Sequence, residues 1–114
     1  MRWRKYGNTK VTVDGLSFDS KAEARRWHEL QIMEQAGVIR NLRRQVPYRL
    51  VKGERWSDGR KHRDVVYIAD FVYEDVEAGK EIVEDVKGVR TDAYRIKREL
   101  MKAVHGIEVQ EVEA

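Results

Sequence analysis

The chain of 114 residues contains no cysteine and one proline. Without cysteine there are no disulfides and no thiolate ligands, so a bound metal would have to sit on oxygen or imidazole groups. No apolar run approaches the roughly 18 residues that a membrane helix needs. The basic start at residues 1–6 is not followed by an apolar stretch, which is unlike a signal peptide. We therefore expect a cytoplasmic protein with neither a membrane nor an organic cofactor among its partners.

Charge is plentiful but nearly balanced. Charged residues make up 38% of the chain, and its 41% of hydrophobic residues suffice for one small core. Because the net charge is only +3, its distribution is more informative than its sum. Residues 1–13 carry four basic side chains and no acid, and residues 55–63 surround a glycine-containing turn with five cations or histidines. Such patches suit a polyanion such as DNA, although a solvated surface explains them nearly as often.

Turn signals and hydrophobic periodicity predict a single α/β domain over residues 1–114, with a basic N-terminal segment at 1–12. A short strand at 11–13 precedes a helix over 20–36, which Gly37 ends. Pro47 places the next strand at a sheet edge or a bulge. The order helix, three strands, helix, strand predicts a small central mixed sheet flanked by two helices. The strands are predicted at 44–51, 67–75, 81–87 and 107–112, and the second helix at 92–104.

Three charged side chains interrupt predicted strands. Asp70 lies inside the apolar run 65–73, which predicts a strand covered on both faces. Asp85 and Lys87 lie two residues apart in the next strand. Such groups are costly to bury unless they are paired, hydrogen-bonded or bound to metal. The strand period puts Asp85 and Lys87 on one face and Glu84 on the other, and an even-numbered loop would add Asp70 to the first face.

Converging carboxylates in this position suit Mg²⁺ or Mn²⁺, which prefer oxygen ligands. Such a metal would polarise a scissile phosphate and activate a bound water. Lys87 could orient that water or stabilise the charge that develops on phosphorus. A buried ion pair that only satisfies itself explains Asp70, Asp85 and Lys87 about equally well.

Glu23 heads the inward face of the first helix, in line with Trp27 and Leu30 at i+4 and i+7. A carboxylate there could reach over the sheet to the same metal ions. Ser20 and Glu23 also have the spacing of a capping box, in which the glutamate bonds the N-cap amide. Taken alone, capping is the more common role for such a glutamate.

The set Glu23, Asp70 and Asp85-Val86-Lys87, in the predicted order of helices and strands, resembles the PD-(D/E)xK nuclease superfamily. In that superfamily a helix glutamate precedes an aspartate and a D/E-x-K triplet on adjacent strands. Four phrases, at residues 18–23, 45–48, 67–71 and 83–88, are similar to those of small phage and prophage endonucleases, which resemble archaeal-type Holliday junction resolvases. This match runs over roughly residues 13–109. The resemblance implies a restriction-endonuclease-like core and a structure-selective endonuclease that makes paired nicks in four-way DNA junctions.

By position, the resemblance implies that Glu23, Asp70 and Asp85 bind Mg²⁺ or Mn²⁺ and that Lys87 is the catalytic lysine. Asp85 departs from many members, which have glutamate there. Gln45 would contact substrate, or it is only a polar strand-edge residue. Paired nicks need two catalytic sets, so we expect a homodimer with twofold symmetry. A nicking or duplex endonuclease and an inactive DNA-binding scaffold are the alternatives.

In the second helix, the spacing predicts a buried stripe of Ala93, Ile96, Leu100 and Val104. Tyr94, Lys97, Arg98 and Met101 would then face away, and Tyr94 and Lys97 could contact a phosphate, although a solvated helix face is the default. The basic turn and the basic N-terminal segment suggest further DNA contacts. The residues predicted to contact DNA are Gln45, Arg60, Lys61, Arg63, Tyr94, Lys97, Arg2, Arg4 and Lys5.

Overall fold

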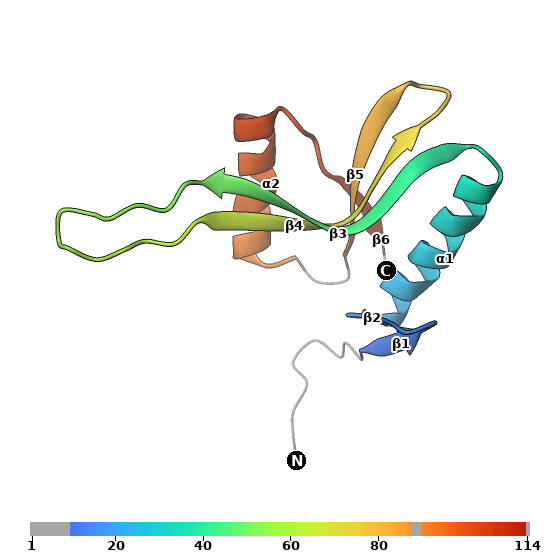
Figure 1. The fold of residues 1–114 in the computed structure, drawn as a ribbon, viewed down its shortest axis with the longest axis horizontal. Coiled ribbons are helices and arrows are strands. Elements are labelled where there is room, and N and C mark those ends of the chain that lie inside the picture. The colour runs from blue at the N-terminus through green and yellow to red at the C-terminus, as the bar shows by residue number, and fades with distance from the viewer. Residues whose placement is uncertain (1–9, 88–89, 114) are drawn as a thin grey trace, which may run out of the picture.

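The computed structural model describes residues 10–87 and 90–113, so the predicted contacts Arg2, Arg4 and Lys5 lie outside the described residues. Two helices and six strands occur in this part of the chain, and all of them except one short strand follow the predicted order (Figure 1). Neither helix is long and apolar enough to cross a membrane. The elements are β1 (Val11–Val13), β2 (Leu16–Phe18), α1 (Lys21–Gln35), β3 (Ile39–Val51), β4 (Val65–Asp75), β5 (Lys80–Lys87), α2 (Asp92–His105) and β6 (Gln110–Glu113).

The main sheet has the strand order β3-β4-β5-β6, and β1 and β2 form a separate two-stranded hairpin. β3, β4 and β5 are antiparallel neighbours, whereas β6 runs parallel to β5. A parallel pair requires a crossover, and α2 supplies it. The predicted mixed sheet with two helices is therefore confirmed, and Pro47 lies on the edge strand β3 as expected.

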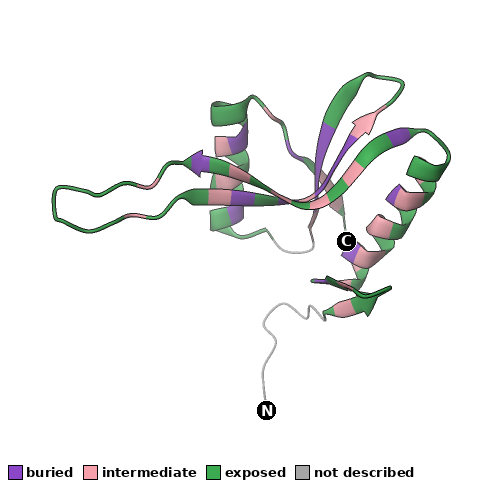
Figure 2. Cartoon of the chain, in the orientation of Figure 1, coloured by how far each residue is buried: buried purple, intermediate pink, exposed green. Residues whose placement is uncertain are grey.

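Each helix covers a different face and a different part of the sheet (Figures 1 and 2). The core beneath α1 contains side chains from the turn end of the β4–β5 hairpin, whereas the core beneath α2 contains side chains from the base of the β3–β4 hairpin. Buried residues on the α1 side are Leu30, Ile39, Phe71, Tyr73 and Ile82. Those on the α2 side are Leu50, Tyr67, Ala69, Val72, Val83, Tyr94, Met101 and Val109.

The regular alternation of faces breaks in the middle of β3 and β4. In β4, Ala69 packs on the α2 side and Phe71 on the α1 side. Residues two positions apart in a strand normally lie on the same face of the sheet. Asp70 lies at this break. In β3, the residue opposite it in register is Gln45, whose backbone is left-handed with φ 54°. The sheet therefore changes its packing partner from α1 to α2 at these two residues.

Beyond this break the β3–β4 hairpin continues as an arm that projects from the body of the molecule (Figure 1). Val65 and Ile68 are exposed on its strands. The prediction that residues 65–73 are covered on both faces is therefore wrong for the outer half of β4. Helix α1 packs against the sheet only as far as this break, and α2 covers only the other face. The face of the arm on the α1 side is therefore not covered by either helix.

Two strands begin three or more residues away from the predicted start, and a third strand was not predicted. β3 begins at Ile39 rather than at residue 44, because a bulge near Asn41 lets the strand bend and stay paired with β4. β6 begins at Gln110 rather than at residue 107, since its register with β5 starts at the Glu84–Gln110 pair. The short strand β2 was not predicted.

The predicted buried stripe of α2 is wrong. Tyr94 and Met101 are 8% and 0% exposed, whereas Ile96 and Val104 are 61% and 50% exposed. Tyr94 and Met101 are seven residues apart and therefore form an alternative stripe on the helix. The larger aromatic and thioether side chains fill the α2-side core, and the Tyr94 hydroxyl donates to Glu111 of β6 at 2.8 Å.

A buried ion pair holds α1 against β5. The Arg26 guanidinium donates to both carboxylate oxygens of Glu84, at 2.7 and 2.8 Å, and the Tyr73 hydroxyl donates to the same carboxylate. The Glu84 side chain is 2% exposed. This contact raises the pKa of Arg26 above its already high ordinary value, chiefly through the bond to Glu84.

We predict that Arg26→Met destabilises the protein by about 3 kcal/mol, because it leaves a buried carboxylate without its cation. Urea unfolding at neutral pH measures the loss. Arg40→Met is the matched control, since Arg40 pairs with Glu74 on the surface and its loss should cost less than about 1 kcal/mol. Equal losses in the two variants would contradict this assignment.

Candidate active site

Two aspartates face each other where β4 and β5 separate. The ladder between these strands ends at the Phe71–Glu84 pair, and Asp70 and Asp85 are the next residues in register. Asp70 Oδ2 instead accepts a hydrogen bond from the backbone amide of Val86 at 2.8 Å. The Asp70 carboxylate thus accepts a backbone hydrogen bond that a carbonyl of β4 would accept in a regular sheet. This bond holds it beside the carboxylate of Asp85.

Asp85 is 2% exposed and is held by two neighbours. The Tyr67 hydroxyl donates to Asp85 Oδ2, and Lys87 Nζ lies 3.2 Å from Asp85 Oδ1. Lys87 Nζ also lies 4.1 Å from the centre of the Tyr94 ring, which fixes the ammonium by a cation–π contact. The predicted sharing of one face by Asp85 and Lys87 is confirmed, and so is the placement of Glu84 on the opposite face.

Glu23 reaches the sheet from the first turn of α1. Its backbone amide donates to the N-cap hydroxyl of Ser20 at 3.1 Å, so half of the predicted capping box is present. Its carboxylate is turned toward β3, where it accepts from Gln45 Nε2 at 3.3 Å and lies 4.0 Å from Arg44. Glu23 is 4% exposed. The backbone of Glu23 therefore takes part in the N-terminal cap of α1, and its side chain contacts β3.

Gln45 lies beside the acids, as predicted for a residue near the site. Register places it opposite Asp70 on β3, so Gln45, Asp70 and Asp85 form a row across three strands. A left-handed backbone costs a residue with a side chain about 1 kcal/mol, and such strain is concentrated at functional sites. Here it accompanies the contact between the Gln45 amide and Glu23.

The acids repel one another. The pKa of Asp70 is raised well above its ordinary value, first by burial and then by the neighbouring carboxylates Asp85 and Glu23. The pKa of Glu23 is also raised, first by burial and then by Asp19, with a smaller contribution from Asp85. In the described part of the chain, no cation lies within ion-pair distance of Asp70, and its polar neighbours are the Val86 amide and the Asp85 carboxyl group. Buried carboxylates in this condition fit a divalent cation.

The acids do not form a closed ligand set as they are placed. Within residues 10–87 and 90–113, no group of three acidic or histidine side chains is close enough to enclose a metal ion. Asp85 is engaged by Tyr67 and Lys87, and Glu23 is engaged by Gln45. The arrangement is a facing pair, Asp70 and Asp85, with Glu23 as the third acid.

The alternative, a buried ion pair with no other role, is present in part as the contact between Asp85 and Lys87. Lys87 pairs with Asp85, but Asp70 stands outside that pair, and its raised pKa favours the protonated form at neutral pH. Because burial and the neighbouring carboxylates oppose the ionisation of Asp70, this residue adds no ion pair of its own to the stability of the fold.

Two residues of the site were not anticipated. Tyr67, which bonds Asp85, resembled an ordinary strand aromatic in the sequence, and Arg44 gave no signal beyond its position in a strand. Arg44 stacks over the Phe18 ring at 4.5 Å and donates to the Ser17 carbonyl at 2.7 Å. Its buried Nε has no partner among the described residues.

The other predicted contact residues are not gathered at the acids. Arg60, Lys61 and Arg63 lie near the tip of the arm, and Lys97 is half-buried on α2. The prediction that Tyr94 faces outward is wrong, because its ring is buried beneath Lys87. Tyr94 therefore positions the lysine instead of presenting itself to a phosphate.

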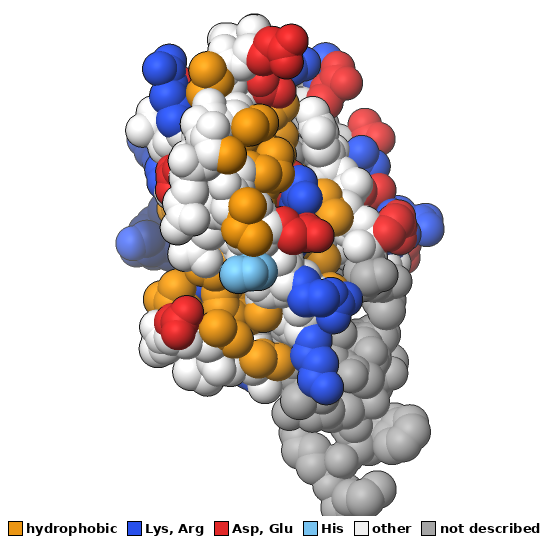
Figure 3. Space-filling view, turned by 90° about the vertical axis from the view of Figure 1, so that its right-hand side faces the viewer, with side chains coloured by type: hydrophobic (Ala, Val, Ile, Leu, Met, Phe, Trp, Pro, Cys, Tyr) orange, Lys and Arg blue, Asp and Glu red, His pale blue; other side chains and the backbone are white. Residues whose placement is uncertain are grey.

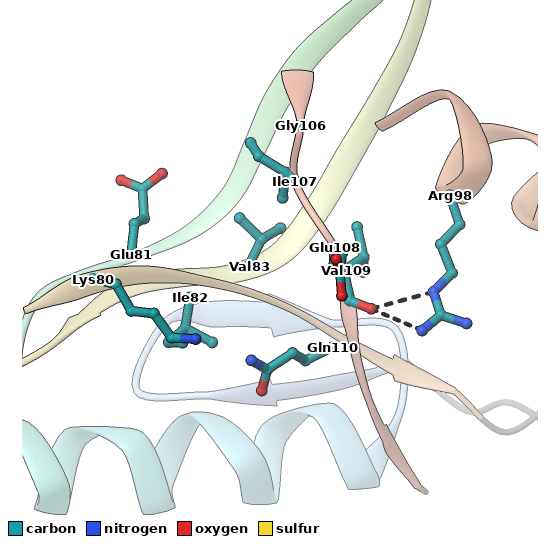
Figure 4. Close-up of a pocket in the computed structure, with 10 residues that line it drawn as sticks. All are labelled: Lys80, Glu81, Ile82, Val83, Arg98, Gly106, Ile107, Glu108, Val109 and Gln110. Carbon is teal, nitrogen blue, oxygen red and sulfur yellow. Dashed lines mark hydrogen bonds between the residues drawn. The ribbon is translucent and has the colours of Figure 1, made fainter. Parts of the chain in front are cut away.

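A polar groove of about 470 Å³ lies elsewhere, between the first half of β5 and the segment that leads into β6 (Figure 4). Lys80, Ile82 and Gln110 are among its lining residues, and Arg98 borders it while donating to the Val109 carbonyl at 2.9 and 3.2 Å. Asp85 and Lys87 occupy the opposite end of β5, so this groove is separate from the acids.

We predict that Asp70→Asn stabilises the metal-free protein at neutral pH by about 1 kcal/mol or more. Because the folded pKa of Asp70 is raised, its favourable contribution is complete below the unfolded pKa near 4 and is lost as pH rises toward the folded pKa. The gain of the variant should therefore vanish near pH 4 and grow with pH. Urea unfolding in EDTA from acidic to neutral pH measures it.

The exposed turn residue Asp14 provides the control, since Asp14→Asn removes a carboxylate outside the core and should change stability little. Mg²⁺ or Mn²⁺ should raise the melting temperature of the wild type and not that of Asp70→Asn. A loss of stability in Asp70→Asn at neutral pH would favour the ion-pair alternative.

Comparison with known proteins gives a family but no described activity. No curated protein and no solved structure matches the chain. One family model, described as "Protein of unknown function (DUF1064)", matches residues 3–111 and therefore covers nearly the whole chain. The match includes all four residues of the site, Glu23, Asp70, Asp85 and Lys87. The chain belongs to the DUF1064 family.

Proposed function

We propose that this protein is a divalent-metal-dependent, structure-selective DNA endonuclease of the Holliday junction resolvase type that acts in the cytoplasm, which is that of the bacterial host if the chain is phage-encoded. The observation that carries the proposal is the facing of Asp70 and Asp85 at the β4–β5 separation. The Asp85 carboxylate is buried and that of Asp70 is half-buried, and ionisation of Asp70 is opposed by like charge without a described cation beside it. Glu23 above them and Lys87 beside Asp85 complete the set.

Asp70, Asp85 and Glu23 would hold Mg²⁺ or Mn²⁺, and the ion would polarise a phosphate and lower the pKa of a water. Asp85 and Tyr94 hold Lys87 from two sides, so its ammonium is presented as a fixed positive charge next to the acids. From there Lys87 would orient the attacking water or stabilise charge on the phosphate oxygens. Gln45 would steady Glu23 and face the substrate.

The arrangement of elements supports a restriction-endonuclease-like core. A helix carrying one acid precedes three antiparallel strands, and the second and third of these strands carry the other acids. A crossover helix then leads to a parallel strand. The four residues named by the PD-(D/E)xK resemblance are brought together by this order, although they span residues 23–87.

The arm supports DNA as the substrate. Its strands cross closely at Gly53, where a Cβ would lie 2.2 Å from the His62 carbonyl oxygen. Trp56 stacks on His62 with ring centres 3.7 Å apart, yet the indole remains 56% exposed. A stiff, narrow arm with an exposed aromatic suits stacking on an unpaired base. The exposed cations near its tip, Arg55, Arg60, Lys61 and Arg63, suit phosphates.

Four-way junctions expose unstacked bases and closely spaced phosphates, which this arm would recognise by shape. No element for reading base edges is evident in the described chain, so shape is the better basis for selectivity. Resolution requires two symmetric nicks, and a chain with one set of acids would supply them as a homodimer. A duplex or nicking endonuclease and an inactive scaffold are the competing functions.

We predict symmetric, metal-dependent nicks when the protein is incubated with labelled four-way junction, nicked duplex and linear duplex in Mg²⁺ or Mn²⁺. Denaturing gels resolve the products, and EDTA should abolish them. Asp70→Asn and Lys87→Ala should lower cleavage by at least about 100-fold while junction binding stays near wild type. Glu81→Gln is the matched control, because this exposed acid of β5 lies outside the site.

Equal cutting of linear duplex would replace the junction assignment with a general endonuclease. Binding without cutting in any metal would favour the scaffold. Cleavage by folded Asp70→Asn at the wild-type rate would refute the site itself.

We predict that Lys61→Ala weakens binding to every DNA form and lowers the slope of log affinity against log salt by up to about 1. Trp56→Ala should instead reduce the preference for the junction over linear duplex, because it removes a stacking surface. Fluorescence anisotropy in a salt series, with EDTA present, measures both. Lys80→Ala, an exposed cation at the start of β5, is the control. An unchanged salt slope in Lys61→Ala would remove the arm from the DNA interface.

A further inference from the structure

Two tyrosines of β4 donate hydrogen bonds to consecutive acids of β5. The Tyr73 hydroxyl donates to Glu84 Oε2 and the Tyr67 hydroxyl donates to Asp85 Oδ2, each at 2.5 Å. Both tyrosines are buried, with exposed fractions of 6% for Tyr73 and 4% for Tyr67. Glu84 is paired with Arg26 and lies on the opposite face from the acid site. Of the two bonds, that of Tyr67 is therefore the one that reaches a proposed metal ligand.

Both oxygens of the Asp85 carboxylate are turned to donors. Oδ2 accepts from the Tyr67 hydroxyl, and Oδ1 lies 3.2 Å from Lys87 Nζ. Each donor is held by further contacts, because the Tyr67 ring packs in the α2-side core and Lys87 Nζ lies 4.1 Å from the centre of the Tyr94 ring. Chelation of one ion by both oxygens of Asp85 would therefore have to displace a donor that its own neighbours hold in place.

This constraint affects divalent ions of different size differently. Ca²⁺ takes about six to eight oxygen ligands and often binds both oxygens of one carboxylate, whereas Mg²⁺ takes about six ligands and keeps several waters. Within residues 10–87 and 90–113, the acids do not form a closed cage. An ion bound here would complete its shell with water, which suits Mg²⁺. Loss of the second Asp85 oxygen thus costs Ca²⁺ a ligand and costs Mg²⁺ little.

The surface outside the site offers no comparable means of selection. On the side of the molecule that carries α1, acidic, basic and apolar side chains are interspersed among the described residues (Figure 3). A mixed surface of this kind creates no extended field of one sign, and such a field would act alike on ions of equal charge. Discrimination between divalent ions must therefore come from contacts inside the acid site.

We infer that Tyr67 is a positioning residue that favours Mg²⁺ over Ca²⁺ by preventing Asp85 from chelating an ion with both oxygens. The inference rests on the proposed function, because it takes Asp85 as a metal ligand. Groups that hydrogen-bond to a metal ligand commonly change metal affinity by about 10–100-fold. A buried hydroxyl also needs a partner for the stability of the fold alone. In that purely structural role, loss of the Tyr67 hydroxyl would affect every ion alike.

Tyr67→Phe tests the inference, because it removes the hydroxyl and keeps the ring. Bound Mn²⁺ is measured by electron paramagnetic resonance on the full chain without DNA, and Mg²⁺ or Ca²⁺ is then titrated in as a competitor. The variant should bind Mg²⁺ about tenfold more weakly than the wild type. It should bind Ca²⁺ at least as tightly as the wild type, because Asp85 Oδ2 becomes available as a second oxygen. The measured quantity is the ratio of the two affinities, which a general loss of stability leaves unchanged.

Tyr73→Phe is the matched control, since it removes the equivalent bond to Glu84. It should lower the melting temperature and leave the ratio of Mg²⁺ to Ca²⁺ affinity at the wild-type value. Lys87→Met is the second variant, and it decides the test if Tyr67→Phe does not fold. Loss of the ammonium should raise the affinity for both ions, and release of Asp85 Oδ1 should shift the ratio toward Ca²⁺.

An unchanged ratio in folded Tyr67→Phe would overturn the inference, and so would an equal shift in Tyr73→Phe. A wild type that binds none of the three ions would overturn both the inference and the metal site of the proposed function. A shifted ratio in a protein that cuts no DNA would support the inference and refute only the proposed activity.

Discussion

The separation of β4 from β5 at Asp70 and Asp85 is the constraint on which the rest of the structure depends. A continuous ladder would leave no room for two facing carboxylates, and a wider gap would leave backbone amides without acceptors. The structure satisfies both requirements because Asp70 accepts the Val86 amide itself. At the same place the sheet changes from packing against α1 to packing against α2. The row of Gln45, Asp70 and Asp85 and the division of the core into two parts therefore arise from the same irregularity.

The helices then serve the acids in different ways. The buried Arg26–Glu84 pair fixes α1 on β5 one helical turn after Glu23, which directs that carboxylate over the sheet. α2 acts from the opposite face, where the Tyr94 ring supports the ammonium of Lys87. Two neighbouring acids of β5 thus have different roles. Glu84 binds α1 through Arg26, and Asp85 forms an ion pair with Lys87.

The features that depend on short-range chemistry were predictable from the sequence. The period of two in β5 correctly separated Asp85 and Lys87 from Glu84, because no irregularity interrupts that strand. The Ser20 cap and the element order followed from capping and turn residues for the same reason. The metal and the DNA substrate remain predictions.

The features that were missed depend on competition between alternatives of similar strength. α2 has two apolar stripes, and only the shape of the sheet decides that Tyr94 and Met101 go inward. The break in alternation at Gln45 and Asp70 has no local signal, since neither residue is a glycine. Tyr67 gave no sign of its role, because its partner Asp85 is 18 residues away.

Because the core is divided into two halves on opposite faces, the molecule need not open all at once. α1 contacts one half-core and α2 the other, so either helix can detach while β4 and β5 stay paired. Detachment of α1 withdraws Glu23 and leaves Asp70 and Asp85 in place. The fraction of molecules with a complete set of acids is then governed by the local opening free energy of α1, which is smaller than the free energy of global unfolding.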